Sequence, residues 1–323
     1  MKISPAFIIS SLLFLFSSTY SSHAQQITPS LEFLTIGTGA KQLASGEATT
    51  AIGIDGLNAL VNPASLGAIN QSMVSANYTL WIAGTEISSF SAVLLEKNQR
   101  LSFSFLSNST GDIEIRDTPG ESLSNANVEY LALTAAYSYT FTPLLTLGIS
   151  ASYLNEQYIV NYANGYSFGF GMFSSLYDNR VRFGAAVNHI GEMQKLNERK
   201  SKLPTQARIG IDADVLSLAF PSDRNFPILF SITTDYIRYL ESLDLTISDD
   251  NIVKNDQALL AGIRVLAADL LAFQTSYRFL TEDIQSWSFG LGIYHGDFSV
   301  DFAFLPLDTG FNPAYSLGMR YSF

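Results

Sequence analysis

The chain of 323 residues has no cysteine and only three histidines: His23, His189 and His295. Without cysteine, the protein has no disulfide, no thiolate ligand for a metal and no cysteine for lipid attachment. The histidines lie far apart in the sequence. The chain also shows no Ser-His-Asp spacing, catalytic elbow or recognisable carboxylate pair. We therefore predict no catalytic residues, no metal and no cofactor, and expect that the protein is not an enzyme.

Charged residues are scarce as well. They make up 15% of the chain, whereas 47% is hydrophobic and 13% aromatic. The net charge of -11 argues against a nucleic-acid partner, because nucleic-acid binding depends on neutralising phosphates. A chain with so few charges and so many aromatic residues is not disordered. It must bury its apolar surface in a core or in lipid.

Long hydrophobic runs are missing after the N-terminus. Residues 1–24 combine Lys2, a short apolar stretch up to Phe16 and a small-x-small site ending at Ala24. This pattern predicts a secretory signal peptide that is cleaved after residue 24. Beyond residue 25 no apolar run reaches the roughly 18 residues of a transmembrane helix. If the mature chain crosses a membrane, it must do so as a closed barrel, which satisfies every backbone group in lipid.

The pattern that is present is an alternation of apolar with small or polar residues, which predicts strands. One clear example is 298–304, where Phe298, Val300, Phe302 and Phe304 alternate with Ser299, Asp301 and Ala303. Fourteen segments are predicted: 72–82, 86–95, 99–107, 128–141, 144–155, 164–176, 180–190, 204–214, 226–236, 257–267, 270–279, 285–294, 297–305 and 314–323.

Two all-β architectures fit this alternation. The polar face of a soluble sandwich meets water and should carry many Lys, Glu and Asp, but here that face is mostly Ser, Gly, Thr, Asn and Gln. Most connections after even-numbered strands are short, such as 142–143, and several after odd-numbered strands are long, such as 108–127. Outer-membrane barrels have this asymmetry. We predict a transmembrane antiparallel β-barrel of about 14 strands at 72–323, located in the outer membrane.

Residues 25–71 do not alternate, and form either a plug in the barrel mouth or a periplasmic lead-in. Asn62-Pro63 predicts a turn, and the glycines permit close packing. The segment resembles the N-terminal signature of the PorV/PorQ family of outer-membrane proteins, which are distant relatives of FadL-type barrels. Lys41 stands where the family usually has Arg, and Ser65 where it usually has Gly. The matching residues are Gly37, Gly39, Ala40, Gly46, Ala48, Asp55, Asn62, Pro63, Ala64 and Leu66.

The resemblance implies a component of the type IX protein secretion system that handles or anchors cargo through protein contacts. The implied partners are other secretion-system proteins and secreted cargo. The motif residues are expected to be structural, with a role in gating or cargo contact as the alternative. The alternative function is a FadL-like channel for hydrophobic small molecules. That function predicts an apolar groove near the N-terminal segment and a lateral opening at a kinked strand. The small polar residues predicted inside the barrel argue against it.

Five arginines fall on the non-aromatic face of predicted strands. Either they pair with inward carboxylates, such as Asp212, Asp214, Asp235 and Asp301, or they line a substrate-selecting lumen. These arginines are Arg182, Arg208, Arg264, Arg278 and Arg320.

The last strand ends in Phe323, with Tyr321 two residues before it. This ending resembles the signal that the outer-membrane assembly machinery recognises. We expect the strand to face lipid and to close the barrel against residues 74–82.

Overall fold

The structure is a computed structural model that describes residues 31–115, 124–158, 161–196, 199–220, 226–243, 255–279, 286–307 and 312–323. The predicted signal peptide at 1–24 and the beginning of the predicted plug at 25–30 lie outside these ranges. Within the described ranges, no helix is both long enough and apolar enough to cross a membrane.

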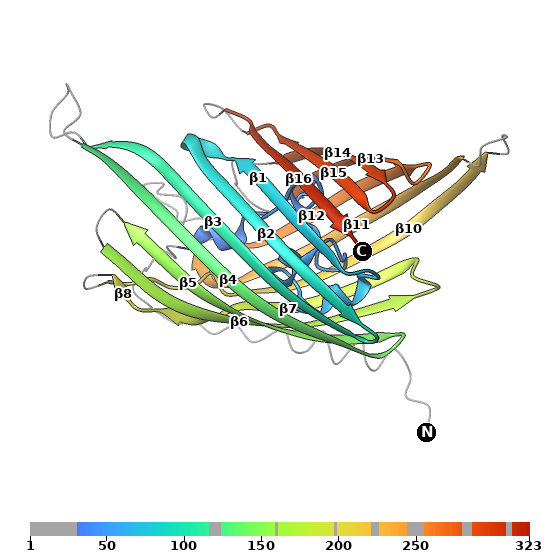
Figure 1. Ribbon diagram of the computed structural model, residues 1–323, viewed down its shortest axis with the longest axis horizontal. Coiled ribbons are helices and arrows are strands. Elements are labelled where there is room, and N and C mark those ends of the chain that lie inside the picture. The colour runs from blue at the N-terminus through green and yellow to red at the C-terminus, as the bar shows by residue number, and fades with distance from the viewer. Residues whose placement is uncertain are drawn as a thin grey trace.

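Fourteen antiparallel strands form one closed barrel, as the alternation predicts (Figure 1). A small hairpin of β8 (Lys195–Leu196) and β9 (Arg199–Lys200) lies in the connection between β7 and β10. The barrel strands are β1 (Met73–Leu80), β2 (Thr85–Glu96), β3 (Gln99–Ile115), β4 (Ser124–Thr142), β5 (Leu145–Tyr158), β6 (Asn161–Leu176), β7 (Val181–Met193), β10 (Gln206–Phe220), β11 (Phe226–Leu243), β12 (Asn255–Ala267), β13 (Leu271–Phe279), β14 (Trp287–His295), β15 (Phe298–Leu305) and β16 (Ala314–Ser322).

The alternation sorts side chains between the two faces of the barrel wall. On β2, Phe90 is 50% exposed on the outer face, whereas Ser89 and Ser91 are buried on the inner face. The same pattern recurs along most strands and leaves a band of exposed Phe, Tyr, Leu and Ile on the outside. An apolar outer band with aromatic residues is the surface that a bilayer covers.

The barrel closes where the C-terminal strand was expected to pair. Val74 of β1 lies opposite Tyr321 of β16, and Leu80 lies opposite Tyr315. The N–H of Phe323 adds a hydrogen bond of 2.8 Å to the carbonyl oxygen of Ser72. This pairing leaves no open sheet edge between the first and last strands.

Several strands extend beyond their predicted ends. The third was predicted to end at 107 and continues, as β3, to Ile115. The ninth was predicted to end at 236 and continues, as β11, to Leu243. The predicted connection 215–225 shrinks in the same way, because β10 continues to Phe220. Pairing continues there although the sequence alternation weakens, because backbone hydrogen bonds do not depend on an apolar outer face.

The two ends of the barrel differ. At one end, here called the turn end, tight connections after β2, β6, β12 and β14 contain residues with positive φ, among them Lys97, Asn179, Asp269 and Gly296. Such residues are typical of tight hairpins. The opposite end, here called the loop end, carries the connections between β1 and β2, β3 and β4, β5 and β6, and β7 and β10.

Residues 31–69, here called the inner segment, lie inside the barrel (Figure 1). The inner segment forms η1 (Glu32–Thr35), α2 (Ala40–Ala44), η2 (Gly56–Leu60) and η3 (Pro63–Ala68). Nearly all of its side chains are buried. The short η4 (Ile82–Gly84) follows β1 at the loop end. The wall and the inner segment therefore share one interior, and the candidate site lies there.

Candidate functional site

Two motif residues cap the short helices of the inner segment. Asp55 accepts a hydrogen bond of 2.9 Å from the N–H of Leu57 at the start of η2. Asn62 accepts one of 3.0 Å from the N–H of Ala64 at the start of η3, where Pro63 occupies the first turn. The amide nitrogen of Asn62 also donates to a wall carbonyl, that of Met172, at 3.1 Å. These side chains hold the inner segment together and attach it to β6.

The motif glycines and Ala40 lie at points of close approach. The N–H of Gly37 donates to Glu47 Oε1 at 2.7 Å. A Cβ added to Gly39 would lie 2.9 Å from Asn77 Oδ1 of β1, and one added to Gly46 would lie 2.4 Å from Ser276 Oγ of β13. Gly46 also has a φ of 58°, a conformation that favours glycine. Ala40 is fully buried against the residues of β15 and β16.

Glycines of the wall make the matching approach from the other side. A Cβ on Gly148 of β5 would lie 2.4 Å from the backbone nitrogen of Ala64. One on Gly184 of β7 would lie 2.0 Å from the carbonyl oxygen of Thr50. Backbone atoms cannot swing aside as a side-chain end can, so the inner segment fits against these strands only because Cβ is absent there.

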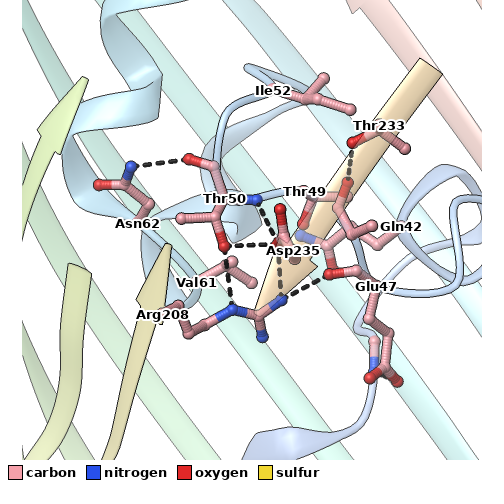
Figure 2. Close-up of polar contacts among 12 residues, drawn as sticks. Gln42, Glu47, Thr49, Thr50, Ile52, Val61, Asn62, Arg208, Thr233 and Asp235 are labelled. Carbon is pink, nitrogen blue, oxygen red and sulfur yellow. Dashed lines mark hydrogen bonds and ion pairs between the residues drawn. The ribbon is translucent and has the colours of Figure 1, made fainter. Parts of the chain in front are cut away.

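A buried ion pair anchors the inner segment to the wall (Figure 2). Arg208 of β10 and Asp235 of β11 pair at 3.1 Å and are 2% and 0% exposed. Arg208 also donates to Thr50 Oγ1 at 3.0 Å and to the carbonyl oxygen of Glu47 at 2.6 Å. Asp235 accepts from Thr50 as well. We call Glu47, Thr50, Arg208 and Asp235 the anchor cluster.

Two further predicted lumen arginines form a network within the wall. Arg182 of β7 bridges Asp212 and Asp214 of β10. Arg264 of β12 lies 3.9 Å from Asp214 and donates to Ser231 Oγ at 3.2 Å. These contacts match the expected pairing of lumen arginines with inward carboxylates, and they brace β7, β10, β11 and β12.

The remaining two lumen arginines contact the inner segment instead. Arg278 of β13 forms an ion pair with Glu47, and Arg320 of β16 donates to the carbonyl oxygen of Ile54 at 3.0 Å. Asp301, a predicted arginine partner, accepts from the hydroxyl of Tyr294 at 3.0 Å. Sequence reasoning missed the role of Glu47, since that residue lies outside any predicted strand and has no pattern that would assign it a direction.

Lys41 and Asp55 are two ionisable groups of the inner segment beside β14 and β16. Burial lowers the pKa of Lys41 from 10.5 to about 7; the positive charge of Arg320 lowers it further, and the negative charge of Asp301 partly opposes this. The Lys41 ammonium lies 5.2 Å from the centre of the Tyr294 ring. Burial raises the pKa of Asp55, while a hydrogen bond from Ser75 and the charge of Arg320 oppose that rise.

Small polar side chains cover most of the inner face of the wall, as the alternation predicts, but the interior is apolar at the loop end. Leu31, Phe33 and Leu34 of the inner segment fill this region, and Phe33 stacks on Tyr130 of β4 with ring centres 5.0 Å apart. We call this group the loop-end cluster. Its other buried members are Leu60, Ile87, Leu106, Ala132, Leu154, Ala163, Met193 and Leu203. The strand pattern concealed it because its wall residues sit near strand ends, singly among serines and asparagines.

The wall is kinked beside this cluster. His189 of β7 has a φ of 58°, and the register between β6 and β7 shifts between Phe168 and Phe170. The bulge turns two consecutive side chains inward, since Asn188 and His189 are both buried. Pairing of β7 with β10 ends at Asn188, although β7 continues to Met193.

On the outer face, near the kink, lies a depression of about 620 Å³. Its lining runs from β2 to β6 and has the small side chains of Ala135 and Ala151 among aromatic rings. The rings are those of Phe90, Phe103, Phe105, Tyr153, Tyr166 and Phe168. This surface belongs to the lipid-facing band.

Two interior spaces next to the inner segment are small. One, lined in part by Lys41, Asp55 and Arg320, measures about 10 Å³, and a second, beside Arg264, has the same volume. Each has room for about one water molecule. Among the described residues, no group of three or more His, Asp or Glu side chains is placed to hold a metal ion. A solute larger than water does not fit in either space.

No family model and no curated protein sequence matches the chain, so membership of the PorV/PorQ family stays a prediction. Solved structures do match over nearly the whole barrel. The toluene transporter TodX of Pseudomonas putida aligns with a TM-score of 0.59 and 12% identity over 89% of this chain and 99% of its own. The monoaromatic hydrocarbon channel CymD aligns with a TM-score of 0.54 and 12% identity over 89% of this chain and 98% of its own.

A FadL homologue of Pseudomonas aeruginosa aligns with a TM-score of 0.52 and 11% identity over 88% of this chain and 98% of its own. These three proteins are a transporter, a channel and a FadL homologue. At such low identity the likeness concerns the fold alone. The chain therefore has the barrel fold of FadL-like outer-membrane proteins.

Proposed function

We propose that the protein is an outer-membrane channel for hydrophobic small molecules. The observation that carries this proposal is the loop-end cluster, the largest of four buried apolar clusters among the described residues of the barrel. An apolar region at the mouth offers a place where a hydrophobic solute leaves water. The fold shared with TodX and CymD supports the same function.

The entry step follows from the occupants of the cluster. Leu31, Phe33 and Leu34 come from the beginning of the inner segment, and the anchor cluster begins only at Glu47. A solute can therefore displace these three side chains while the anchor cluster stays intact. An apolar solute recovers the same kind of contact that the three side chains give up, so the exchange is nearly balanced.

The exit step uses the kinked wall. Beyond Asn188, β7 continues without the β10 pairing that seals the wall elsewhere. The kink also borders the outer depression, because Phe168 lies at the register shift and lines that depression. A solute that leaves the barrel sideways here passes from the apolar loop-end cluster to the apolar depression on the outer face. We place here the lateral opening at a kinked strand that the uptake hypothesis predicts.

The location and partners belong to the proposal too. The exposed apolar band supports a place in the outer membrane, with lipid around the barrel and the assembly machinery as a transient partner. The secretion role implied by the PorV/PorQ resemblance is the second candidate. It is supported by the motif residues from Gly37 to Leu66, all of which lie inside the barrel or against its wall.

One deletion experiment separates the two candidates. Cells lacking the chain and cells expressing it are compared for uptake of labelled toluene and for secretion and surface anchoring of proteins. Slower uptake with normal secretion is expected. Normal uptake together with failed secretion contradicts the channel and supports the secretion component.

A variant then tests the cluster itself. Phe33→Ala removes a ring that occupies the cluster, so we expect faster toluene uptake at low concentration. The matched control is Phe298→Ala, which removes an exposed ring from the outer face. Equal uptake in both variants and the wild type contradicts entry through the loop-end cluster.

A further inference from the structure

Three polar residues meet where β7 and β10 stop pairing. Asn188 lies directly opposite Gln206 in the register, and His189 follows it in the bulge. Asn188 is 1% exposed, Gln206 2% and His189 3%. All three face the interior, because the bulge turns both β7 residues inward and Gln206 shares the inner face of β10 with Arg208.

Each residue has a buried atom without a hydrogen-bond partner among the described residues: Asn188 Oδ1, His189 Nε2 and Gln206 Oε1. The amide nitrogen of Asn188 donates to the carbonyl oxygen of Val61, which fixes Oδ1 as the free atom. Buried acceptors of this kind are costly, and native proteins normally supply a donor.

Which ring nitrogen of His189 carries the proton follows from the hydrogen bond that the ring makes. Its ring hydrogen-bonds to the backbone of Leu34. The N–H of Leu34 already donates to Leu31, so the carbonyl of Leu34 is the partner and the ring donates from Nδ1–H. In the neutral ring, Nε2 then carries a lone pair. All three free atoms are therefore acceptors, and they require a donor.

These acceptors lie at the edge of the loop-end cluster. His189 contacts Leu34, a member of the cluster, and Asn188 contacts Val61, next to the member Leu60. The hydroxyl of Thr205, the neighbour of Gln206, donates to the carbonyl oxygen of His189 at 2.9 Å. An apolar region thus ends in a group of acceptors, which suits a molecule with a hydrocarbon body and a donor at one end.

Charge limits which chemical group can be the donor. A carboxylate would bring its negative oxygens against three acceptors. A cation would meet Arg208, which is close enough to act electrostatically on His189. A neutral hydroxyl avoids both conflicts and still donates.

We propose that Asn188, His189 and Gln206 form a polar subsite that binds the hydroxyl group of a neutral alcohol or phenol. The hydrocarbon part of that molecule would lie in the loop-end cluster in place of Leu31, Phe33 and Leu34. This inference rests on the proposed function and specifies the class of solute.

Binding is tested with the purified full-length protein in detergent micelles. The chain has two tryptophans, of which Trp81 packs against the loop-end cluster and Trp287 lies on the outer face. In a Trp287→Phe background, emission from Trp81 reports occupation of the cluster. The probes are cyclohexylmethanol and ethylcyclohexane, which have similar shapes and differ by a hydroxyl in place of a methyl group.

We expect the alcohol to bind about tenfold more tightly than the hydrocarbon. Gln206→Met removes one acceptor and should lower this ratio severalfold, while binding of ethylcyclohexane stays unchanged. The matched control is Gln274→Met on β13, whose Oε1 already accepts from Ser45 Oγ at 2.9 Å. Partition of a given probe into micelles is the same for every variant and cancels when variants are compared. The affinities of the two probes are compared at their free concentrations, which are measured with micelles alone.

Folding is checked by urea denaturation. Gln206→Met deletes an unsatisfied acceptor and should not weaken the fold, in contrast to Gln274→Met. Equal affinity of the wild type for both probes means that water alone occupies the subsite; it overturns this inference and leaves the channel standing. An alcohol preference that is undiminished in Gln206→Met also overturns it. If neither probe binds, the proposed function fails as well.

Discussion

Asp235 accepts two hydrogen bonds from Thr50, which lies 185 positions earlier in the chain: one from its N–H at 2.9 Å and one from its hydroxyl at 2.5 Å. Both residues are fully buried. One belongs to the barrel wall and the other to the inner segment. The contact therefore couples the seating of the inner segment to the stability of the wall.

Asp235→Asn should destabilise the protein by about 3–5 kcal/mol, because it leaves the buried charge of Arg208 unpaired. The midpoint of urea unfolding measures this change, and protease cleavage within residues 31–69 reports a loosened inner segment. Asp214→Asn is the matched control. Asp214 is 15% exposed and Arg182 keeps Asp212 as a partner, so the loss should stay near 1 kcal/mol or below. Similar losses in the two variants contradict a special role for the anchor cluster.

Gly148→Ala tests the close approach of β5 to the inner segment. The new Cβ would lie 2.4 Å from backbone atoms of Pro63 and Ala64, so the inner segment must shift. We expect destabilisation of about 1–3 kcal/mol and a higher conductance in planar bilayers. In the control, Gly111→Ala, the atom nearest to the new Cβ is Asn127 Oδ1 at 3.7 Å, so neither the stability nor the conductance should change. Unchanged conductance in Gly148→Ala means that the inner segment tolerates the displacement.

How much of this was predictable varies with the kind of interaction. The strands and their closing pair followed from period-two alternation, since lipid outside and a packed interior impose opposite demands on successive residues. Val74 opposite Tyr321 is an example. The path of the inner segment did not follow, because its contacts join residues such as Thr50 and Asp235 that no local pattern connects.

The kink at His189 shows a second limit. Residues 181–190 alternate as a regular strand, and nothing in Asn188-His189-Ile190 distinguishes a bulge from continued pairing. Across the β6–β7 pair the bulge faces Gly169, where a Cβ would lie 2.8 Å from Asn188 Oδ1. Sequence alone cannot place these two residues opposite each other, so both the kink and the acceptor group became visible only in the structure.

Lys41 makes stability depend on pH. Its pKa is about 7 in the folded protein and 10.5 in its ordinary state, so between these values the unfolded chain binds one more proton. The free energy of unfolding should therefore rise with pH across this window, by at most about 1.4 kcal/mol per pH unit. Lys41→Met removes the rise, whereas Lys97→Met, at an exposed turn, retains it. The midpoint of urea unfolding, measured from pH 7 to 10, tests this prediction. A rise in Lys41→Met as steep as in the wild type contradicts the assignment of the rise to Lys41.

A disulfide can distinguish the lateral exit from passage straight through the lumen. The chain has no cysteine, so Ala40→Cys and Gly318→Cys introduce a single pair, and their Cβ atoms would lie 3.3 Å apart, close to the roughly 3.5–4.5 Å of disulfides. The amide end of Asn77 must turn aside to admit the new Cβ on β16. The bond ties α2 to β16 and leaves residues 31–36 free. We expect toluene uptake to continue with the bond formed. A loss of uptake that a reductant reverses indicates that α2 must move, and that the solute crosses the lumen.

Removal of Phe323 separates assembly from stability. Its side chain is 60% exposed on the outer face and stacks on Tyr321 with ring centres 6.2 Å apart, while its N–H bonds to Ser72. Deletion removes one edge hydrogen bond and a ring that contacts little protein, so the purified barrel should lose only about 1 kcal/mol. If the assembly machinery reads this terminus, the amount of protein in the outer membrane falls much further, severalfold. Phe298→Ala removes a ring opposite Tyr321 on the same face but leaves the terminal residues unchanged, so it should not share the defect. Equal membrane levels of the two variants contradict a terminal assembly signal, and a large loss of urea stability on deletion assigns Phe323 to the fold instead.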